Sequence, residues 1–491
     1  MRIKAVFVCL LTALILACSQ KDSTSKPEGP YFGNGFHNGW ADQESIVIWT
    51  RLTKEKEGNM EGQQFLSISK DEMDLLDENP SKEKIHSAQI PQGFDLDDME
   101  GACPGSPGEV KLAYFPINQP DKKMELPWVA VNNDENFTHQ WQLEGLTADT
   151  EYQVILEARG GSETGVSDKI EGKFYLPPKA EQEKEISFTI VSCHDYLRKD
   201  QPDGHQIYRS MLKLDPDFYV HTGDIEYYDK QEPWAMTEEL MRFKWDRLFA
   251  LPLQREFWTQ NTSYFMKDDH DALRNDAFPG MSYGTVSWER GLEIFDQEQF
   301  PSNSKPYKTI RWGKDLQIWI TEGRNYRSRN TDPDQRGKTI WGETQKQWLF
   351  TTMQESDATF KVLITNDPIL GPDRDNKSDN YANSNFKYEG DEIRDFLNQF
   401  ENTFITCGDR HWQYVTHYED TNLWEFGSGS GADQHAGGWK QEDVRPEHRF
   451  LRVKGGYLFA KVFQEDGKAA ISFQHHDVDG NMVHEEIFYA N

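Results

Sequence analysis

The stretch FTIVSCHDYL, residues 188–197, runs a short apolar strand directly into cysteine, histidine and aspartate. Further along the chain, the segments FYVHTGD, LQIWITEG, FKVLITND and NTFITCGD repeat this form, an apolar strand that ends in polar residues. Helical segments lie between them. In GDEIRDFLNQF, Ile393, Phe396, Leu397 and Phe400 have the i, i+3, i+4, i+7 spacing of a helix with one buried face. Alternating strands and helices predict a layered α/β domain over residues 179–491.

The residues before this domain have a different pattern. Residues 31–178 predict an all-β domain, because ESIVIWTRL and the segments around LTADTEYQVILEA are rich in β-branched and aromatic residues. Leu146, Thr150 and Tyr152 follow the pattern of a tyrosine corner, which is typical of fibronectin- and Ig-like sandwiches. Residues 70–125 are charged and rich in glycine and proline, so we expect long loops there. YLPPKAEQEKE, residues 175–185, predicts a linker.

The N-terminus predicts export. Arg2 and Lys4 precede the apolar run AVFVCLLTALILA, which is too short for a comfortable membrane span and indicates a signal peptide. The motif ILAC resembles a bacterial lipobox. We therefore expect a lipoprotein signal peptide at 1–17, lipidation of Cys18 and a tether at 18–30; ordinary cleavage with Cys18 left as a thiol is the alternative. The expected location is the bacterial cell envelope, periplasmic or at the outer membrane or cell surface, with membrane contact only through the lipid anchor.

The net charge and the cysteine content limit the classes of protein to which this chain can belong. The formal net charge is −30, which repels nucleic-acid phosphates and suits a protein that holds cations. Of five cysteines, only Cys103, Cys193 and Cys407 lie beyond the predicted lipidation site. An odd and sparse set argues against a disulfide framework. We expect Cys407 to be an ordinary buried thiol.

The polar residues at the strand ends indicate a metal site. Cys193 follows the first strand of the α/β domain, and Asp224 with Tyr227 follows the second. KDDHDALRND, residues 267–276, and GDRH, residues 408–411, supply further acids, amides and histidines. Ligand sites in α/β sheets lie at the carboxyl ends of strands, so these groups should converge. Converging carboxylates repel unless cations hold them, and this donor set suits a transition metal beside a harder cation.

These motifs resemble the PhoD-like alkaline phosphatases of the calcineurin-type metallophosphoesterase superfamily. The resemblance rests on Ser192–Cys193 after the first strand, on a Gly-Asp pair with tyrosine three residues later, on the Asp-Asp-His-Asp block with a following asparagine, and on Gly-Asp-x-His. EGRNYRSR (322–329) and WGETQKQWL (341–349) add lesser matches, and the resemblance covers nearly all of the mature chain. It implies an α/β metallophosphoesterase sandwich over 179–491 behind the N-terminal β-sandwich domain.

The resemblance also implies a two-metal centre, Fe³⁺ with Ca²⁺, with Mn²⁺ or Zn²⁺ as alternatives. Asp224 would bridge the ions. The implied metal ligands are Cys193, Asp224, Tyr227, Asn275, Asp409 and His411. His270, with Asp269, would act as general acid for the leaving alkoxide; a histidine that only orients a ligand is an equal alternative. The arginines that could bind phosphate are Arg324, Arg374 and Arg410, and we expect at least one of them to be a structural ion pair.

The implied activity is hydrolysis of phosphate mono- or diesters by a metal-activated hydroxide that attacks phosphorus. One alternative is a surface lipoprotein that binds a glycan or a protein partner and retains a vestigial phosphatase site. Another is an acyl hydrolase with a Cys193–His194 dyad, which is weaker because adjacent residues of a strand point to opposite faces. The sequence leaves open the natural ester and the oligomeric state.

Overall fold

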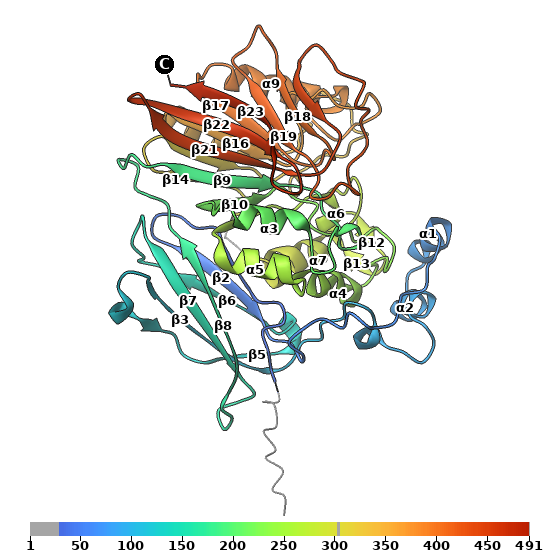
Figure 1. Cartoon of the computed structure of the whole chain (residues 1–491). Helices are drawn as coiled ribbons and strands as arrows, with labels where there is room; N and C mark the ends of the chain where they lie inside the picture. Colours follow the sequence, from blue (N-terminus) through green and yellow to red (C-terminus); the bar gives the residue numbers. More distant parts are fainter. Residues whose placement is uncertain (1–28, 302–304, 491) are drawn as a thin grey trace, which may run out of the picture.

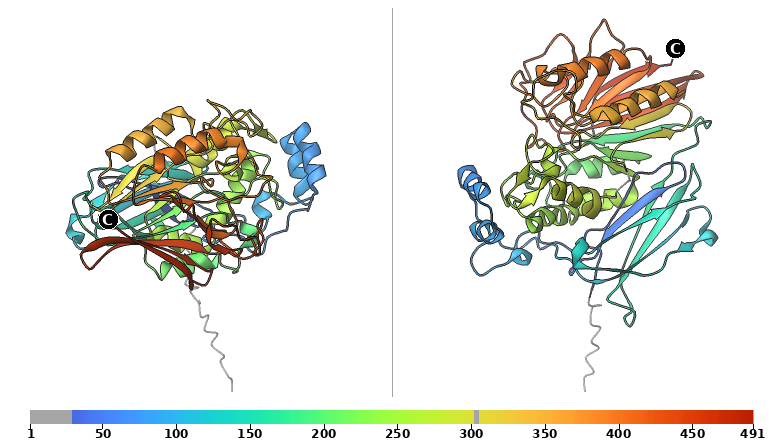
Figure 2. Two further views of the ribbon diagram at one scale, coloured as in Figure 1. Left: turned by 90° about the horizontal axis from the view of Figure 1, so that it is seen from above. Right: turned by 180° about the vertical axis from the view of Figure 1, so that it is seen from behind.

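The computed structural model describes residues 29–301 and 305–490. The predicted signal peptide, Cys18 and all but the last two residues of the predicted tether lie outside the described residues. The chain has a mixed α/β fold with several sheets, as the sequence predicts (Figure 1; Figure 2). Within the described residues, no helix is long and apolar enough to cross a bilayer.

The N-terminal part contains two antiparallel sheets. One is formed by β1 (Phe36–Gly39), β2 (Ile46–Arg51) and β6 (Thr138–Leu143). The other is formed by β3 (Gly108–Pro116), β4 (Met124–Glu125), β5 (Val129–Val131), β7 (Glu151–Arg159) and β8 (Val166–Tyr175). The hydroxyl of Tyr152 accepts a hydrogen bond from the backbone N–H of Thr147 at 2.9 Å, which is the contact expected of a tyrosine corner. The fibronectin- or Ig-like assignment stays a prediction.

The expectation of long loops over residues 70–125 is wrong. This stretch contains helices α1 (Lys70–Glu78) and α2 (Lys82–Gln89) besides β3 and β4. Ser69 begins α1 with a capping box: its side chain accepts from the Glu72 N–H, and the Glu72 carboxylate accepts from the Ser69 N–H. Such reciprocal bonds give acceptors to backbone N–H groups that otherwise have no partner at the start of a helix. They favour a helix here although the segment is rich in charged residues. Both helices stand out to one side of the molecule in Figure 1.

The α/β part is built on two larger sheets. The first is six-stranded, and the order of its strands is β11 (Ser263–Phe265), β10 (Phe218–His221), β9 (Ile186–Val191), β21 (Tyr457–Glu465), β22 (Lys468–His476) and β23 (Met482–Tyr489). The second is seven-stranded, in the order β14 (Lys308–Trp312), β15 (Leu316–Ile320), β16 (Phe360–Thr365), β17 (Thr403–Cys407), β19 (Trp424–Ser428), β18 (Gln413–His417) and β20 (His448–Arg452). In each sheet the strands that lead to the polar motifs run parallel to one another.

Helices cover the outer face of each large sheet. Apolar side chains of both sheets, among them Ile190 and Phe404, share one buried cluster. The other face of the six-stranded sheet packs on α3 (Gln206–Leu212), α4 (Glu238–Phe249), α5 (Pro252–Gln260) and α7 (Trp288–Glu293). The other face of the seven-stranded sheet packs on α8 (Gly342–Glu355) and α9 (Lys387–Leu397). Ile393, Phe396 and Leu397 of α9 are buried, as their spacing predicts.

The buried core of the N-terminal strands is continuous with that of the α/β part. The buried cluster between the two large sheets continues into side chains of β1, β2, β3 and β7. β8 ends at Tyr175 and β9 begins at Ile186, which brackets the predicted linker. The boundary at residue 178 stays a prediction.

Candidate metal centre and active site

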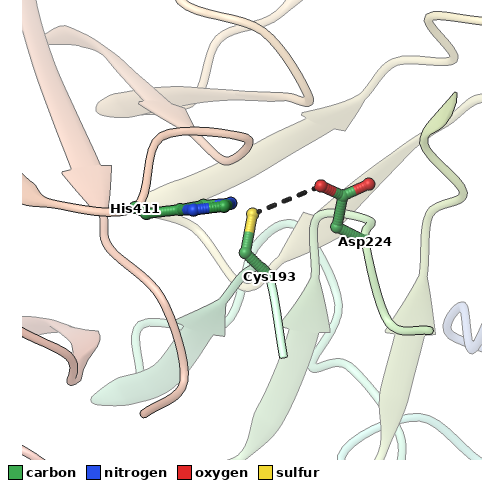
Figure 3. Close-up of side chains that lie close together, drawn as sticks. All are labelled: Cys193, Asp224 and His411. Atoms are coloured by element: carbon green, nitrogen blue, oxygen red, sulfur yellow. Dashed lines mark hydrogen bonds between the residues drawn. The ribbon is translucent and has the colours of Figure 1, made fainter. Parts of the chain in front are cut away.

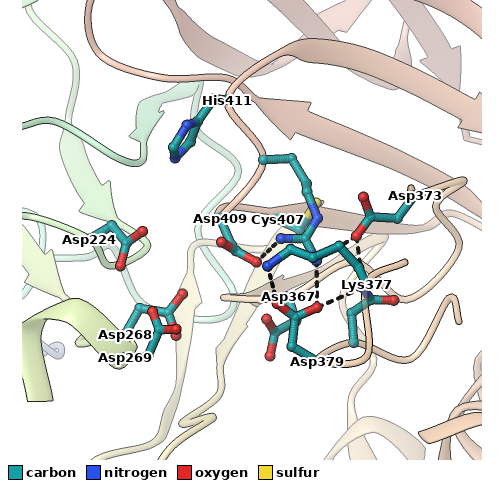
Figure 4. Close-up of polar contacts among 12 residues, drawn as sticks. Asp224, Asp268, Asp269, Asp367, Asp373, Lys377, Asp379, Cys407, Asp409 and His411 are labelled. Atoms are coloured by element: carbon teal, nitrogen blue, oxygen red, sulfur yellow. Dashed lines mark hydrogen bonds and ion pairs between the residues drawn. The ribbon is translucent and has the colours of Figure 1, made fainter. Parts of the chain in front are cut away.

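Polar side chains from both large sheets meet where their strands end (Figure 4). Three groups have ligand atoms that all lie within 4.8 Å of one another and could hold a metal ion. They are Cys193, Asp224 and His411; Asp224, Asp269 and His270; and Asp224, Asp268 and Asp409. Asp224 belongs to all three groups, so it is the centre of the arrangement.

The loops that carry these side chains have unusual backbone conformations. Cys193, Asp224 and Asp409 have φ angles of 52°, 53° and 56°, in a region that residues other than glycine rarely adopt. Residues held in this way are concentrated at functional sites. The loops are also closely packed, because a Cβ atom at Gly223 would lie 2.5 Å from the Asp268 Cβ. Glycine before Asp224 is therefore a steric requirement.

Cys193 and His411 face Asp224 (Figure 3), and Tyr227 contacts it as well. The Cys193 Sγ lies 3.7 Å from Asp224 Oδ2, and the Tyr227 hydroxyl donates to the same oxygen at 3.0 Å. The Tyr227 hydroxyl also lies 3.3 Å from His411 Nε2. Burial, followed by the charge of Asp224, raises the pKa of both Cys193 and Tyr227 well above their ordinary values. Burial lowers the pKa of His411 to about 3, so its imidazole is neutral and can donate a lone pair to a metal.

The acids of the site have buried oxygens that need a partner. Asp224 Oδ1 and Asp268 Oδ2 make no hydrogen bond to the described residues. Burial, with the nearby charge of Asp269, raises the pKa of Asp224 to about 6 and that of Asp268 well above its ordinary value. Buried carboxylates without partners are unfavourable, and cations between them would remove this penalty. The donor set of thiol, phenol, imidazole and carboxylate therefore fits a transition metal beside a harder cation.

His270 is held by an acid that the sequence analysis did not select. Its Nδ1 lies 2.5 Å from Asp229 Oδ1. Burial disfavours a charged imidazole, but the carboxylates of Asp229, Asp269 and Asp224 outweigh burial and raise the pKa of His270 to about 10. Asp269 accepts the backbone N–H groups of His270 at 3.0 Å and of Asp276 at 2.7 Å. The structure brings His270 and Asp269 together beside Asp224, and their catalytic roles stay predictions.

Asn275, a predicted ligand, is exposed. Its side-chain N–H donates to Asp276 Oδ2 at 2.8 Å, and its backbone N–H donates to Asp229 Oδ2 at 2.9 Å. The structure therefore points this side chain to Asp276. Asp268 lies among the three groups, although it was not among the predicted ligands. A signal for it was present, because Asp268 stands as far beyond β11 as Asp224 stands beyond β10.

Arg410 and Arg324 are buried against acids. Arg410 is 1% exposed and pairs with Asp373 at 2.6 Å, Asp379 at 3.1 Å and Asp409. Arg410 therefore forms the structural ion pair that we expected of at least one of the three arginines. Arg324 is also 1% exposed, and its Nη2 lies 2.5 Å from Asp268 Oδ1.

Arg374 has a different environment. Its side chain is 32% exposed, and its Nε lies 3.4 Å from Asp373 Oδ1. Its guanidinium lies 5.4 Å from the centre of the Trp412 ring. Of the three predicted phosphate-binding arginines, Arg374 is the one whose side chain reaches solvent.

The described cysteines form no disulfide. Cys103, Cys193 and Cys407 are free and buried, and Cys407 Sγ lies 3.0 Å from the Tyr414 hydroxyl. His194 does not pair with Cys193, because its Nε2 lies 2.6 Å from the Tyr208 hydroxyl. The sequence argument assumed that Cys193 and His194 lie in a strand and therefore point to opposite faces. β9 ends at Val191, before both residues, so that argument does not apply to them.

Comparison with known proteins gives one family match and structures of similar fold. Residues 295–482 match the PhoD-like phosphatase family. A solved structure of PhoD is similar with a TM-score of 0.68 and 14% identity, over 95% of this chain and 91% of that chain. A structure of GAP50, the anchor in the inner membrane complex of Plasmodium, has a TM-score of 0.39 and 11% identity, over 63% of this chain and 90% of that one. No curated protein sequence matches.

The family match covers one part of the candidate site. The family match includes Asp409 and His411, whereas Cys193, Asp224 and His270 precede the matched residues. The family match and the similarity to PhoD together confirm the resemblance to PhoD-like phosphatases that the sequence motifs indicated, and they support a phosphoric ester hydrolase.

Proposed function

We propose that this chain is a metal-dependent hydrolase of phosphate esters whose metal ions would be held by Asp224 and the side chains grouped with it. The observation that carries the proposal is the presence of Asp224 in all three groups of potential ligands, with Oδ1 unpaired. Cys193, Tyr227 and His411 would hold Fe³⁺ with Asp224, because anionic and imidazole donors suit it. The acids Asp268, Asp269 and Asp409 would hold Ca²⁺, which prefers oxygen ligands. Mn²⁺ and Zn²⁺ are the alternatives.

The protein side chains would bind the ester and move a proton. Ions bound at Asp224 would supply charge that neutralises phosphate oxygens and acidifies the attacking water. Arg374 would pair with a phosphate oxygen through its guanidinium. A protonated His270 holds one proton toward Asp229 through Nδ1 and carries another on Nε2, which it would donate to the leaving alkoxide.

Elemental analysis and ester hydrolysis test this proposal together. Protein stripped of metal should lose hydrolysis of p-nitrophenyl phosphate and of bis(p-nitrophenyl) phosphate, and added metal should restore it. Asp224→Asn should lower both metal content and rate. Asp357→Asn is the matched control, because Asp357 is exposed, pairs with Arg311 and precedes β16 at the opposite end of its strand. If Asp224→Asn behaves like this control, the proposal is wrong.

We also propose the envelope location that the N-terminus indicates, with a lipid on Cys18 and no binding of nucleic acid. The support is the sequence alone, namely the lipobox-like ILAC and the net charge of −30. Cys18→Ser expressed in bacteria should move the protein from the membrane fraction to the soluble fraction and abolish labelling by a radioactive fatty acid. Unchanged fractionation would reject the anchor and leave the enzymatic proposal untouched.

A further inference from the structure

A buried lysine of helix α4 contacts the turn formed by residues 227–230. The side chain of this lysine, Lys244, is 1% exposed. Its Nζ atom donates to the backbone carbonyl oxygen of Tyr227 and, at 3.3 Å, to that of Lys230. The backbone N–H of Lys230 also donates to the Tyr227 carbonyl oxygen, at 3.4 Å. Lys244 therefore bridges the two ends of the turn.

This turn carries groups that belong to the candidate active site. The Tyr227 hydroxyl donates to Asp224 Oδ2 at 3.0 Å. Asp229 Oδ1 lies 2.5 Å from His270 Nδ1, and the backbone N–H of Tyr228 donates to the His270 carbonyl oxygen at 3.4 Å. The turn thus contacts His270 both at its ring and at its backbone, so its position affects where the imidazole lies.

Two more side chains of α4 hold the same loop. Trp245 Nε1 donates to the Tyr228 hydroxyl at 2.5 Å, and both of these side chains are fully buried. Arg247 Nη1 donates to the carbonyl oxygen of Glu232 at 2.9 Å. Three side chains from one turn of α4 therefore bond to residues 227–232. A packed helix is a rigid support for such a loop.

The charge of Lys244 is not explained well by stability alone. Glu226 Oε1 lies 3.4 Å from Lys244 Nζ, and the Glu226 side chain is 0% exposed. The other oxygen, Glu226 Oε2, is buried and makes no hydrogen bond to the described residues. Apolar residues of similar volume often stabilise a fold as well as a buried ion pair does. An apolar residue, however, has no donor for the two carbonyl oxygens on either side of Asp229.

We propose that Lys244 is a positioning residue, which holds the turn of residues 227–230 so that Asp229 orients His270 for donation of a proton to the leaving alkoxide. Lys244 bonds to the backbone of the turn, so it acts through Asp229 and not on the ester itself. This inference rests on the proposed function, in which His270 supplies that proton.

Two esters that differ in their leaving group test the role of Lys244. p-Nitrophenolate is stable as an anion, whereas phenolate is more basic and leaves far more readily when a general acid protonates it. The readout is kcat for phenyl phosphate divided by kcat for p-nitrophenyl phosphate, with the corresponding diesters as a second pair, measured on the metal-loaded full chain. A misplaced general acid lowers this ratio, whereas a smaller amount of folded enzyme leaves it unchanged.

A double variant and a matched control separate positioning from stability. Lys244→Met alone would leave Glu226 as an unpaired buried charge, so it is combined with Glu226→Gln. The double variant should lower the ratio about tenfold with little change in KM. Arg242→Met removes a cation of the same helix that pairs with Glu298 at 2.7 Å, and it should leave the ratio unchanged even if it lowers the unfolding temperature. Equal losses on both esters, or an unchanged ratio in the double variant, would overturn the proposal.

The variant Asp229→Asn tests whether Lys244 acts through Asp229. Substitutions that act through one contact are not additive. In the Asp229→Asn background, the two substitutions at Lys244 and Glu226 should therefore lower the ratio no further. A second tenfold loss in that background would show that Lys244 acts on another part of the site, and it would overturn the proposal.

A failure of the proposed function has a different outcome, which is that the metal-loaded wild-type chain hydrolyses neither pair of esters. The role of Lys244 is then judged by proton NMR of the Zn²⁺-loaded full chain. The proton between His270 Nδ1 and Asp229 should give a resonance far downfield, which is identified by its absence in His270→Gln. Loss of this resonance in the double variant and its retention in Arg242→Met support positioning by Lys244. An unchanged resonance in the double variant rejects it.

Discussion

The Nδ1 atom of His270 and the Oδ1 atom of Asp229 lie 2.5 Å apart. This contact fixes the orientation of the imidazole and stabilises its charged form, with the pKa of His270 raised to about 10 by Asp229 and two other acids against the effect of burial. Asp229→Asn should therefore lower kcat about 10- to 100-fold with little change in KM.

The pH profile of the Asp229→Asn variant tests the same contact. A general acid is active while it is protonated, so the rate falls as pH rises through the pKa of His270. Loss of the Asp229 charge lowers that pKa, and the alkaline limb of the profile should move to lower pH. A variant with a reduced rate and an unmoved alkaline limb would favour the alternative in which His270 only orients a ligand.

Removal of metal should destabilise the fold. The acids around Asp224 are buried and two of their oxygens are unpaired, and ions that bind only the folded state add stability by mass action. A chelator should lower the thermal unfolding midpoint of the wild-type protein. The same chelator should have little effect on Asp224→Asn, which lacks the shared ligand. Equal shifts in both proteins would contradict a metal centre at Asp224.

The same substitution should change the free energy of unfolding by different amounts at Arg410 and at Arg374. Arg410→Gln leaves the buried carboxylates of Asp373 and Asp379 without their shared partner, and it should lower the free energy of unfolding by about 3–5 kcal/mol. Arg374→Gln should change stability little because the side chain reaches solvent. Urea denaturation of both variants checks this. Similar losses would show that Arg374 also has a structural role.

His37 should limit stability in acid. It is fully buried among Trp49, Phe249 and Trp258, and neither ring nitrogen has a partner among the described residues. Burial lowers its pKa from 6.5 to about 3. Between these pH values the unfolded chain binds a proton that the folded chain does not, so stability falls as pH falls.

The magnitude of this effect is about 2 kcal/mol at pH 5. His37→Phe should abolish that part of the acid dependence, and its advantage over the wild-type protein in thermal unfolding should grow as pH falls from 7 to 4. Parallel decline of the two proteins over this range would contradict the assignment.

Much of the α/β part could be predicted because the signals are local. The strands that end near Cys193, Asp224 and Asp409 are short apolar runs. The buried apolar residues of α9 recur with the spacing of a helix. Their carboxyl ends meet because parallel strands place them at one edge. The helices α1 and α2 were missed because charged composition was weighed above the Ser69–Glu72 capping pair.

The missed site residues depend on tertiary contacts. Asp229 stands two residues beyond Tyr227, but only the folded loop brings it to His270. Conversely, Arg410 was selected for its charge, and two of the three acids that neutralise it, Asp373 and Asp379, come from a separate segment.

The strand that leads to Cys193 has neighbours from opposite ends of the α/β part. β9 pairs with β10 along one edge and with β21 along the other, and β22 and β23 extend the sheet from there. During synthesis the ribosome makes β9 long before β21, so the growing chain has one edge of this strand bare until its final segment emerges. The sheet that leads to Cys193 can therefore be completed only after β21, β22 and β23 have been made.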